Sequence, residues 1–160
     1  MERLWAPWRL EYINKDRTEG CVFCEKPLEN NDREAYIIYR GKNAYVILNI
    51  YPYSNGHIMV VPFAHVSSLE DLPADATHEM MDLAQLSIRA LNLAFSPDGI
   101  NMGINQGAAA GAGIAAHLHM HLVPRWQGDT NFMPVLGDTR IIPQSLQRSW
   151  EVLREALDNS

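Results

Sequence analysis

A short segment near residue 120 alternates histidine with large apolar residues. It reads His117-Leu118-His119-Met120-His121-Leu122-Val123-Pro124. Alternation with a period of two is typical of a β-strand, whose successive side chains point to opposite faces. A strand over 117–124 would place the three imidazoles on one surface face, about 6.7 Å apart, with Leu118, Met120 and Leu122 facing the core. Surface imidazoles add little stability, so the pattern favours a functional site over chance.

Short β-prone runs and amphipathic stretches flank this segment. Strands are predicted over residues 35–39, 44–48, 57–62 and 100–105, with a hairpin turn at 40–43. A helix is predicted over Asp75–Phe95, because apolar residues form one stripe at spacings of three and four: Met80, Ala84, Ile88, Leu91 and Phe95. A last helix is expected to open at Pro143, with one face formed by Leu146, Trp150, Leu153 and Leu157. Neighbouring hairpins around one long helix indicate an α+β fold with a mainly antiparallel sheet.

Length and charge narrow the class of protein. A chain of 160 residues with 47% hydrophobic content suits a single domain over residues 1–160. The net charge of −6 gives no electrostatic reason to bind long nucleic acid. No apolar run reaches the roughly 18 residues of a membrane span, and the first residues lack the apolar stretch of a secretory signal. We therefore expect an intracellular, cytoplasmic protein that does not bind membranes.

Two further sequence features, a cysteine pair and a glycine-rich segment, are typical of binding sites. Cys21 and Cys24, the only cysteines, form a C-x-x-C pair, which in a reducing compartment favours a metal or redox pair over a structural disulfide. The segment 105–113 is rich in glycine and alanine, so it forms either a tight turn or a loop that presents main-chain N–H groups to a phosphate.

The histidines themselves allow two kinds of chemistry. Three imidazoles can bind a metal, as in zinc hydrolases. Alternatively, one neutral imidazole can attack phosphorus as a nucleophile. The residues alone leave both alternatives open.

At these residues the sequence resembles the histidine-triad (HIT) superfamily of nucleotide hydrolases and transferases. The family pattern is His-φ-His-φ-His-φ-φ, with φ hydrophobic, and the segment 48–65 is similar to the family's Asn…Pro…Gly-His…Pro…His segment. The likeness covers about residues 20–126. The flanking extensions, with Leu4–Arg9 at the start and residues 124–144 at the end, resemble a bacterial branch that includes dinucleoside tetraphosphate phosphorylases and hydrolases.

The resemblance implies a role for individual residues. His119 would be the catalytic nucleophile that takes the nucleotidyl group. The implied substrate-binding residues are Asn49 for the ribose, and His57, Asn105, Gly111, Ala112, Gly113 and His121 for the phosphates. Many relatives carry Ser or Thr at the position of Gly113 and Gln at that of Ala112, so a hydroxyl that would assist the leaving group is missing here. Histidine at 121, instead of Gln, argues against the galactose-1-phosphate uridylyltransferase branch.

The resemblance also implies a metal and a partner. A structural zinc ion would be held by Cys21, Cys24, His65 and His117, a closed tetrahedral set without an open position for water. Relatives pair two subunits through a helix and a strand, so a homodimer is expected. His78 matches no family position, and we expect it on an exposed helix face.

The expected function is nucleotidyl transfer from the α-phosphate to water or phosphate, with dinucleoside polyphosphates such as diadenosine tetraphosphate as substrates. Three alternatives stay open. They are an adenosine phosphoramidase-type HIT enzyme, a zinc hydrolase that uses all three triad histidines, and a non-catalytic nucleotide-binding protein.

Overall fold

The computed structural model describes residues 20–129 and 142–159. Five strands form one sheet in the order β1-β2-β3-β5-β4, and every neighbouring pair is antiparallel. The strands are β1 (Ile37–Arg40), β2 (Ala44–Leu48), β3 (Ile58–Pro62), β4 (Gly99–Ile104) and β5 (Met120–Arg125). The helices are α2 (Val22–Glu25), α3 (Asp32–Ala35), α4 (Ala74–Phe95) and α6 (Leu146–Asp158), with 3-10 turns at η1 (Lys26–Leu28), η2 (Leu69–Asp71) and η3 (Ala108–Ala110).

The predicted α+β class is therefore confirmed. The segments expected at Leu4–Arg9 and around Asn131-Phe132 lie outside the described residues. Within the described ranges, no helix combines the length and the apolar character needed to cross a membrane.

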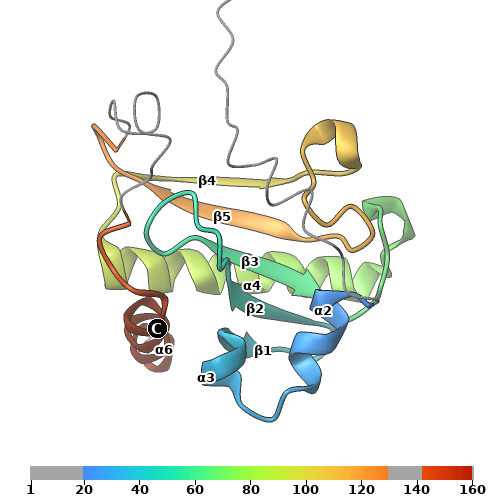
Figure 1. Ribbon diagram of the computed structural model, residues 1–160, viewed down its shortest axis with the longest axis horizontal. Helices are drawn as coiled ribbons and strands as arrows, with labels where there is room; N and C mark the ends of the chain where they lie inside the picture. The colour runs from blue at the N-terminus through green and yellow to red at the C-terminus, as the bar shows by residue number, and fades with distance from the viewer. Residues whose placement is uncertain (1–19, 130–141, 160) are drawn as a thin grey trace, which may run out of the picture.

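Each face of the sheet has its own apolar core. The long helix α4 runs behind the sheet, and the short helices α2 and α3 lie on the other side of it (Figure 1). Alternate residues of β2 divide between the two cores, with Val46 and Leu48 in the α4 core and Tyr45 and Ile47 in the α2 core. The three predicted inward residues of the histidine segment join the α4 core, as expected: Leu118, Met120 and Leu122.

The predicted first residue agrees closely with the structure for one of the two long helices but not for the other. Helix α4 starts one residue earlier than expected and ends at Phe95, where Ser96 takes a left-handed conformation with φ of 46°. Helix α6 begins at Leu146, so the expected start at Pro143 was wrong. The reason is the cap, because the Ser145 hydroxyl accepts a hydrogen bond from the Arg148 N–H at 3.2 Å.

The first predicted strand is also shifted. A one-turn helix, α3, occupies Asp32–Ala35, and Tyr36 follows it with φ of 59°. The Asn31 side chain accepts a hydrogen bond from the Glu34 N–H at 3.4 Å and so caps this turn. The strand therefore starts at Ile37 instead of Ala35.

The histidine segment forms a strand only in its second half. β5 begins at Met120, three residues after the predicted start, because its partner β4 ends opposite it at Ile104. The side chains of His117 and His119 are only 0% and 4% exposed, so the expected surface position was wrong for these two. The ring of Phe23 from α2 packs over both, at centroid distances of 5.5 and 5.0 Å.

Candidate active site

One cavity of about 480 Å³ joins the histidine segment to the glycine-rich loop. That volume lies within the range of small-molecule sites. One part of its wall is apolar and comes from α2, α3, β2 and β3, with Val22, Phe23, Ala35, Ile47 and Met59. Other parts of the wall come from Lys26, Leu48, the loop after β2, the glycine-rich loop and the histidine segment. The loop residues are Asn49, Ile50, Tyr51, Tyr53, Ala108 and 111–115, and the histidines are His119 and His121.

The His119 ring has a defined protonation pattern. Its Nδ1 lies 2.8 Å from the main-chain oxygen of His117. A carbonyl oxygen can only accept, so Nδ1 carries the proton and Nε2 keeps its lone pair. Burial lowers the pKa of His119, although the bond to His117 acts in the opposite direction. The ring is therefore a neutral imidazole at pH 7, and its unprotonated Nε2 is chemically able to act as a nucleophile.

A chain of hydrogen bonds sets the tautomer of His121. The Tyr53 main-chain N–H donates to Nδ1 of His57 at 3.1 Å, so the proton of His57 is on Nε2. That Nε2–H donates to Nδ1 of His121 at 3.0 Å. The proton of His121 is consequently on its Nε2, where it can donate to an anionic oxygen. His57 is 0% exposed and is not among the residues that line the cavity, but it contacts His121, which does line it.

A second group of side chains converges beside these histidines. The donor atoms of Cys21, Cys24, His65 and His117 all lie within 4.8 Å of one another. Nδ1 of His117 is 3.3 Å and 3.5 Å from the two sulfur atoms, and Nδ1 of His65 is 3.3 Å from Sγ of Cys24. Zn–S bonds of about 2.3 Å and Zn–N bonds of about 2.0 Å hold donors about 3.5 Å apart, so this set fits a tetrahedral zinc ion.

The orientation of His117 also suits a metal ligand. Its Nε2–H donates to the Pro62 carbonyl oxygen at 2.8 Å, which leaves the Nδ1 lone pair directed at the two thiols. His119 and His121 instead direct their Nδ1 atoms at a carbonyl and at His57. The three triad histidines thus do not converge on one point, which argues against a three-histidine zinc centre.

The glycine-rich loop begins where β4 ends. Gly107 and Gly111 have φ of 84° and 86°, conformations that strongly favour glycine. The Gln106 side chain ties the start of the loop to η2 by accepting from the Leu69 N–H at 2.9 Å. The N–H groups of Gly111 and Ala112 donate within the turn itself, to Ala108 and Gly107 oxygens at 3.0 and 3.4 Å.

Of the remaining residues expected to bind substrate, some line the cavity and one does not. Asn49 lines the cavity, and its side-chain oxygen accepts from the Tyr51 N–H at 2.9 Å. Gly111, Ala112 and Gly113 line it as well. Asn105 follows β4 and is half-buried, but it is not part of the cavity wall. His78 is exposed on α4, as expected.

Sequence reasoning did not identify the apolar wall. Val22 and Phe23 lie between the two cysteines, and Lys26 follows one turn later. The available signal was an apolar pair inside a C-x-x-C segment. Helix α2 must turn one face toward the Cys/His group and another toward the sheet.

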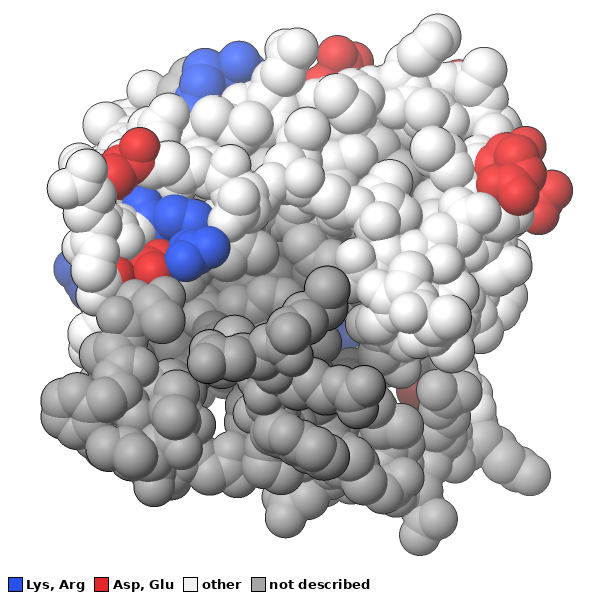
Figure 2. Space-filling view, turned by 90° about the horizontal axis from the view of Figure 1, so that it is seen from above, with Lys and Arg blue, Asp and Glu red and all other residues white. Residues whose placement is uncertain are grey.

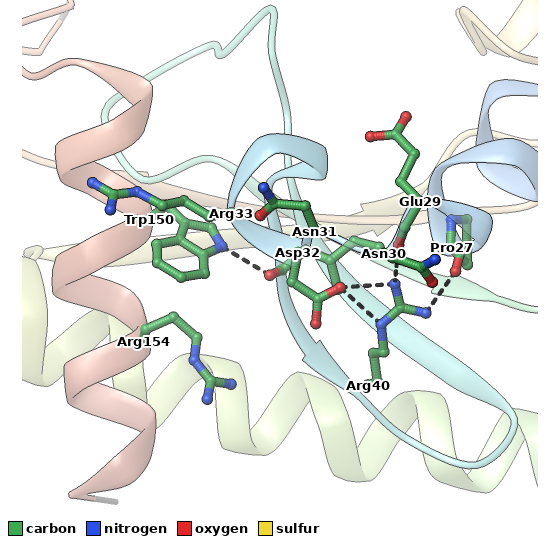
Figure 3. A pocket seen from close by; sticks show the side chains of 10 residues that line it. Pro27, Glu29, Asn30, Asn31, Asp32, Arg33, Arg40, Trp150 and Arg154 are labelled. Atoms are coloured by element: carbon green, nitrogen blue, oxygen red, sulfur yellow. Dashed lines mark hydrogen bonds and ion pairs between the residues drawn. The ribbon is translucent and has the colours of Figure 1, made fainter.

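A second cavity, of about 520 Å³, lies between α3, β1 and α6 (Figure 3). Its charged side chains are engaged with their neighbours. Arg40 pairs with Asp32 at 2.7 Å and donates to the Pro27 carbonyl. Trp150 and Arg154 of α6 donate to the main-chain oxygens of Ile37 and Ile38 at 2.8 and 2.7 Å. This region closes the outer edge of β1, and we assign it no ligand.

The fold and the site together define a family of proteins. The HIT domain matches residues 30–128, and the chain belongs to the HIT family. The class expected from the sequence, a HIT-type nucleotide hydrolase or phosphorylase, is confirmed. A relative from Mycobacterium tuberculosis called AP-4-A phosphorylase is 40% identical over 162 aligned positions, which cover 96% of this chain and 83% of that protein.

Solved structures agree with this assignment. A Zn-bound histidine triad family protein from Mycobacterium smegmatis has a TM-score of 0.71 and 33% identity, over 88% of this chain and 94% of its own. A protein from Sulfolobus tokodaii described as a hypothetical histidine triad nucleotide-binding protein has a TM-score of 0.70 and 26% identity, over 87% of this chain and 93% of its own.

Proposed function

We propose that this enzyme cleaves dinucleoside polyphosphates at the α-phosphorus by way of a nucleotidyl-His119 intermediate. The observation that carries the proposal is the 2.8 Å bond from Nδ1–H of His119 to the His117 oxygen. It leaves an unprotonated Nε2 on a neutral ring in the cavity wall. A neutral imidazole is a good nucleophile at pH 7, and a covalent intermediate divides one difficult displacement into two.

The surrounding groups suit the two halves of a nucleotide. The apolar wall with Phe23 and Ile47 offers a surface for the base, and Asn49 offers amide groups for the ribose. His121 presents a neutral Nε2–H toward a phosphate oxygen. In the first step the Nε2–P bond forms as the P–O bond to the leaving polyphosphate breaks, and in the second step the acceptor oxygen displaces His119.

We propose inorganic phosphate as the preferred acceptor and diadenosine tetraphosphate as a substrate. The support is the 40% identity to a protein called AP-4-A phosphorylase. Attack by His119 releases ATP and leaves AMP on the enzyme, and phosphate then releases that AMP as ADP. Water in place of phosphate would release AMP.

Product analysis tests the acceptor directly. Diadenosine tetraphosphate is incubated with the enzyme, with and without phosphate, and the products are separated by ion-exchange chromatography. ADP plus ATP in phosphate supports the proposal, whereas AMP plus ATP under both conditions makes the enzyme a hydrolase. Slow turnover of diadenosine tetraphosphate with and without phosphate, together with rapid cleavage of adenosine phosphoramidate, would place the enzyme in the phosphoramidase branch. Tight nucleotide binding without turnover of either substrate would identify a non-catalytic nucleotide-binding protein.

We further propose that the Cys21, Cys24, His65 and His117 cluster holds a structural zinc ion. The support is the fit of the donor spacing to tetrahedral zinc and the Zn-bound relative from Mycobacterium smegmatis. A closed set of two thiolates and two imidazoles supplies folding energy and no Lewis-acid position.

We also propose a homodimer in the cytoplasm. Among the described strands β4 pairs on one side only, with β5. Met102 on that edge is 48% exposed, and Leu93 on α4 is 59% exposed. The described part of the face seen in Figure 2 carries only scattered charged side chains. Light scattering after gel filtration measures the mass, and a monomer at micromolar concentration would overturn this.

A further inference from the structure

Two residues, His117 and Phe23, connect the Cys/His cluster to the ring of His119. His117 directs its Nδ1 toward the cysteine sulfurs, and its main-chain oxygen accepts the His119 proton at 2.8 Å. Its remaining ring nitrogen is bonded to Pro62. A metal bound at the Cys/His cluster would therefore fix a residue whose main-chain oxygen also sets the His119 tautomer, and a shift of the His117 main chain after metal loss would alter that hydrogen bond.

The second connection runs through Phe23. This residue lies between Cys21 and Cys24, is 4% exposed and belongs to the wall of the cavity. The His119 ring lies between Phe23, at a centroid distance of 5.0 Å, and His121, at 4.8 Å. Phe23 thus limits the rotation of the nucleophilic ring.

Helix α2 is too short to hold the Phe23 side chain by itself, and the hydrogen bond from the Tyr45 hydroxyl at 2.7 Å fixes only the Phe23 main-chain oxygen. The helix is a single turn of four residues, with N–H groups of Cys24 and Glu25 bonded to the Cys21 oxygen at 2.9 and 3.0 Å. Its N-cap has no side-chain hydrogen bond. One turn is below the length at which helices are stable alone, because nucleation costs more than a few hydrogen bonds return.

We propose that Phe23 is a positioning residue for His119, and that metal bound at the Cys/His cluster holds it in place. This inference rests on the proposed role of His119. Metal occupancy would then set the orientation and tautomer of the nucleophile and the shape of the nucleotide pocket, although the metal touches no substrate. Outer groups that orient a metal-ligating histidine typically affect metal affinity or activity about 10- to 100-fold, and we expect an effect near the lower end of that range for the contact that orients His119.

Two readouts that do not depend on turnover test the proposal. Nitrogen-15 NMR of the imidazoles reports the His119 tautomer, and calorimetry reports the dissociation constant for AMP. Both are measured on zinc-loaded enzyme, on chelator-treated enzyme that circular dichroism shows to be folded, and on zinc-loaded Phe23→Ala. We expect a single Nδ1–H tautomer in the loaded enzyme, and mixed tautomers with about tenfold weaker AMP binding in the other two samples.

Matched variants separate positioning from general stability. Phe23→Leu should recover most of the affinity, because it restores an apolar contact over the ring. Leu153→Ala, in the core beside α4, should lower the melting temperature and leave the tautomer and the AMP affinity unchanged. The double variant Cys24→Ser/Phe23→Ala should bind AMP no more weakly than either single variant, because both act through one contact.

The proposal is overturned if metal-free enzyme keeps the loaded tautomer and AMP affinity, if loaded Phe23→Ala behaves as wild type, if the two substitutions add, or if the protein takes up no zinc. A failure of the proposed function looks different. In that case no nucleotidyl-His119 forms with any substrate, while the tautomer and the AMP affinity still respond to zinc and to Phe23.

Discussion

The main-chain oxygen of His117 accepts the Nδ1 proton of His119 at 2.8 Å. These two histidines are two residues apart in sequence, yet His117 faces the Cys/His cluster and His119 lines the cavity of about 480 Å³. This bond leaves His119 as a neutral ring with an unprotonated Nε2, and it joins the Cys/His cluster to the cavity beside it.

Replacing the nucleophile should stop turnover but allow binding. For His119→Asn we expect kcat to fall by at least about 10³-fold, since removing a covalent nucleophile costs several orders of magnitude. AMP binding measured by calorimetry should survive. His78→Asn, an exposed position on α4, is the control and should keep wild-type kcat. Near-normal turnover of His119→Asn would assign the nucleophile to another residue.

Metal content should be one zinc per chain, measured by elemental analysis of metal-replete protein. Cys24→Ser should abolish it and lower the free energy of unfolding by about 2–5 kcal/mol, because metal-binding energy is folding energy. A chelator should lower the melting temperature of the wild type but have no further effect on the variant. Full zinc content in Cys24→Ser would exclude this cluster as the site.

His57 should act through the tautomer of His121. His57→Leu removes the Nε2–H that donates to Nδ1 of His121 at 3.0 Å, and we expect kcat to fall about 10- to 100-fold. His57→Gln keeps an N–H donor and an acceptor for the Tyr53 N–H, so it should retain more of the activity. Steady-state kinetics on diadenosine tetraphosphate compares the two, and equal losses would contradict a role in hydrogen bonding.

The β1 edge should depend on α6 for stability only. Trp150→Phe removes the bond from Nε1–H to the Ile37 oxygen at 2.8 Å and leaves a carbonyl unpaired, which costs about 1–3 kcal/mol. Arg148→Ala, which loses only an exposed pair with Glu151, should cost less than about 0.5 kcal/mol. Urea unfolding measures both. Because this region is separate from the cavity wall, kcat/KM should change for neither variant.

Local pattern was enough to predict much of this protein. The period of the apolar stripe located α4 to within one residue, since helical spacing is a property of neighbouring residues. The alternation around His119 separated the inward apolar residues from the histidines. The histidine pattern also identified the family, and the family resemblance predicted the four residues whose donor atoms the structure brings together.

Only the tertiary structure decided which groups surround each histidine. Cys21 and His117 are 96 positions apart, and His57 and His121 are 64 apart, so no local pattern encodes their contacts. The start of β5 depends on where β4 ends, and the burial of His119 depends on a one-turn helix that packs over it. A hydrogen-bond acceptor determines which ring nitrogen keeps its proton, and these acceptors reach the histidines only when the sheet has formed.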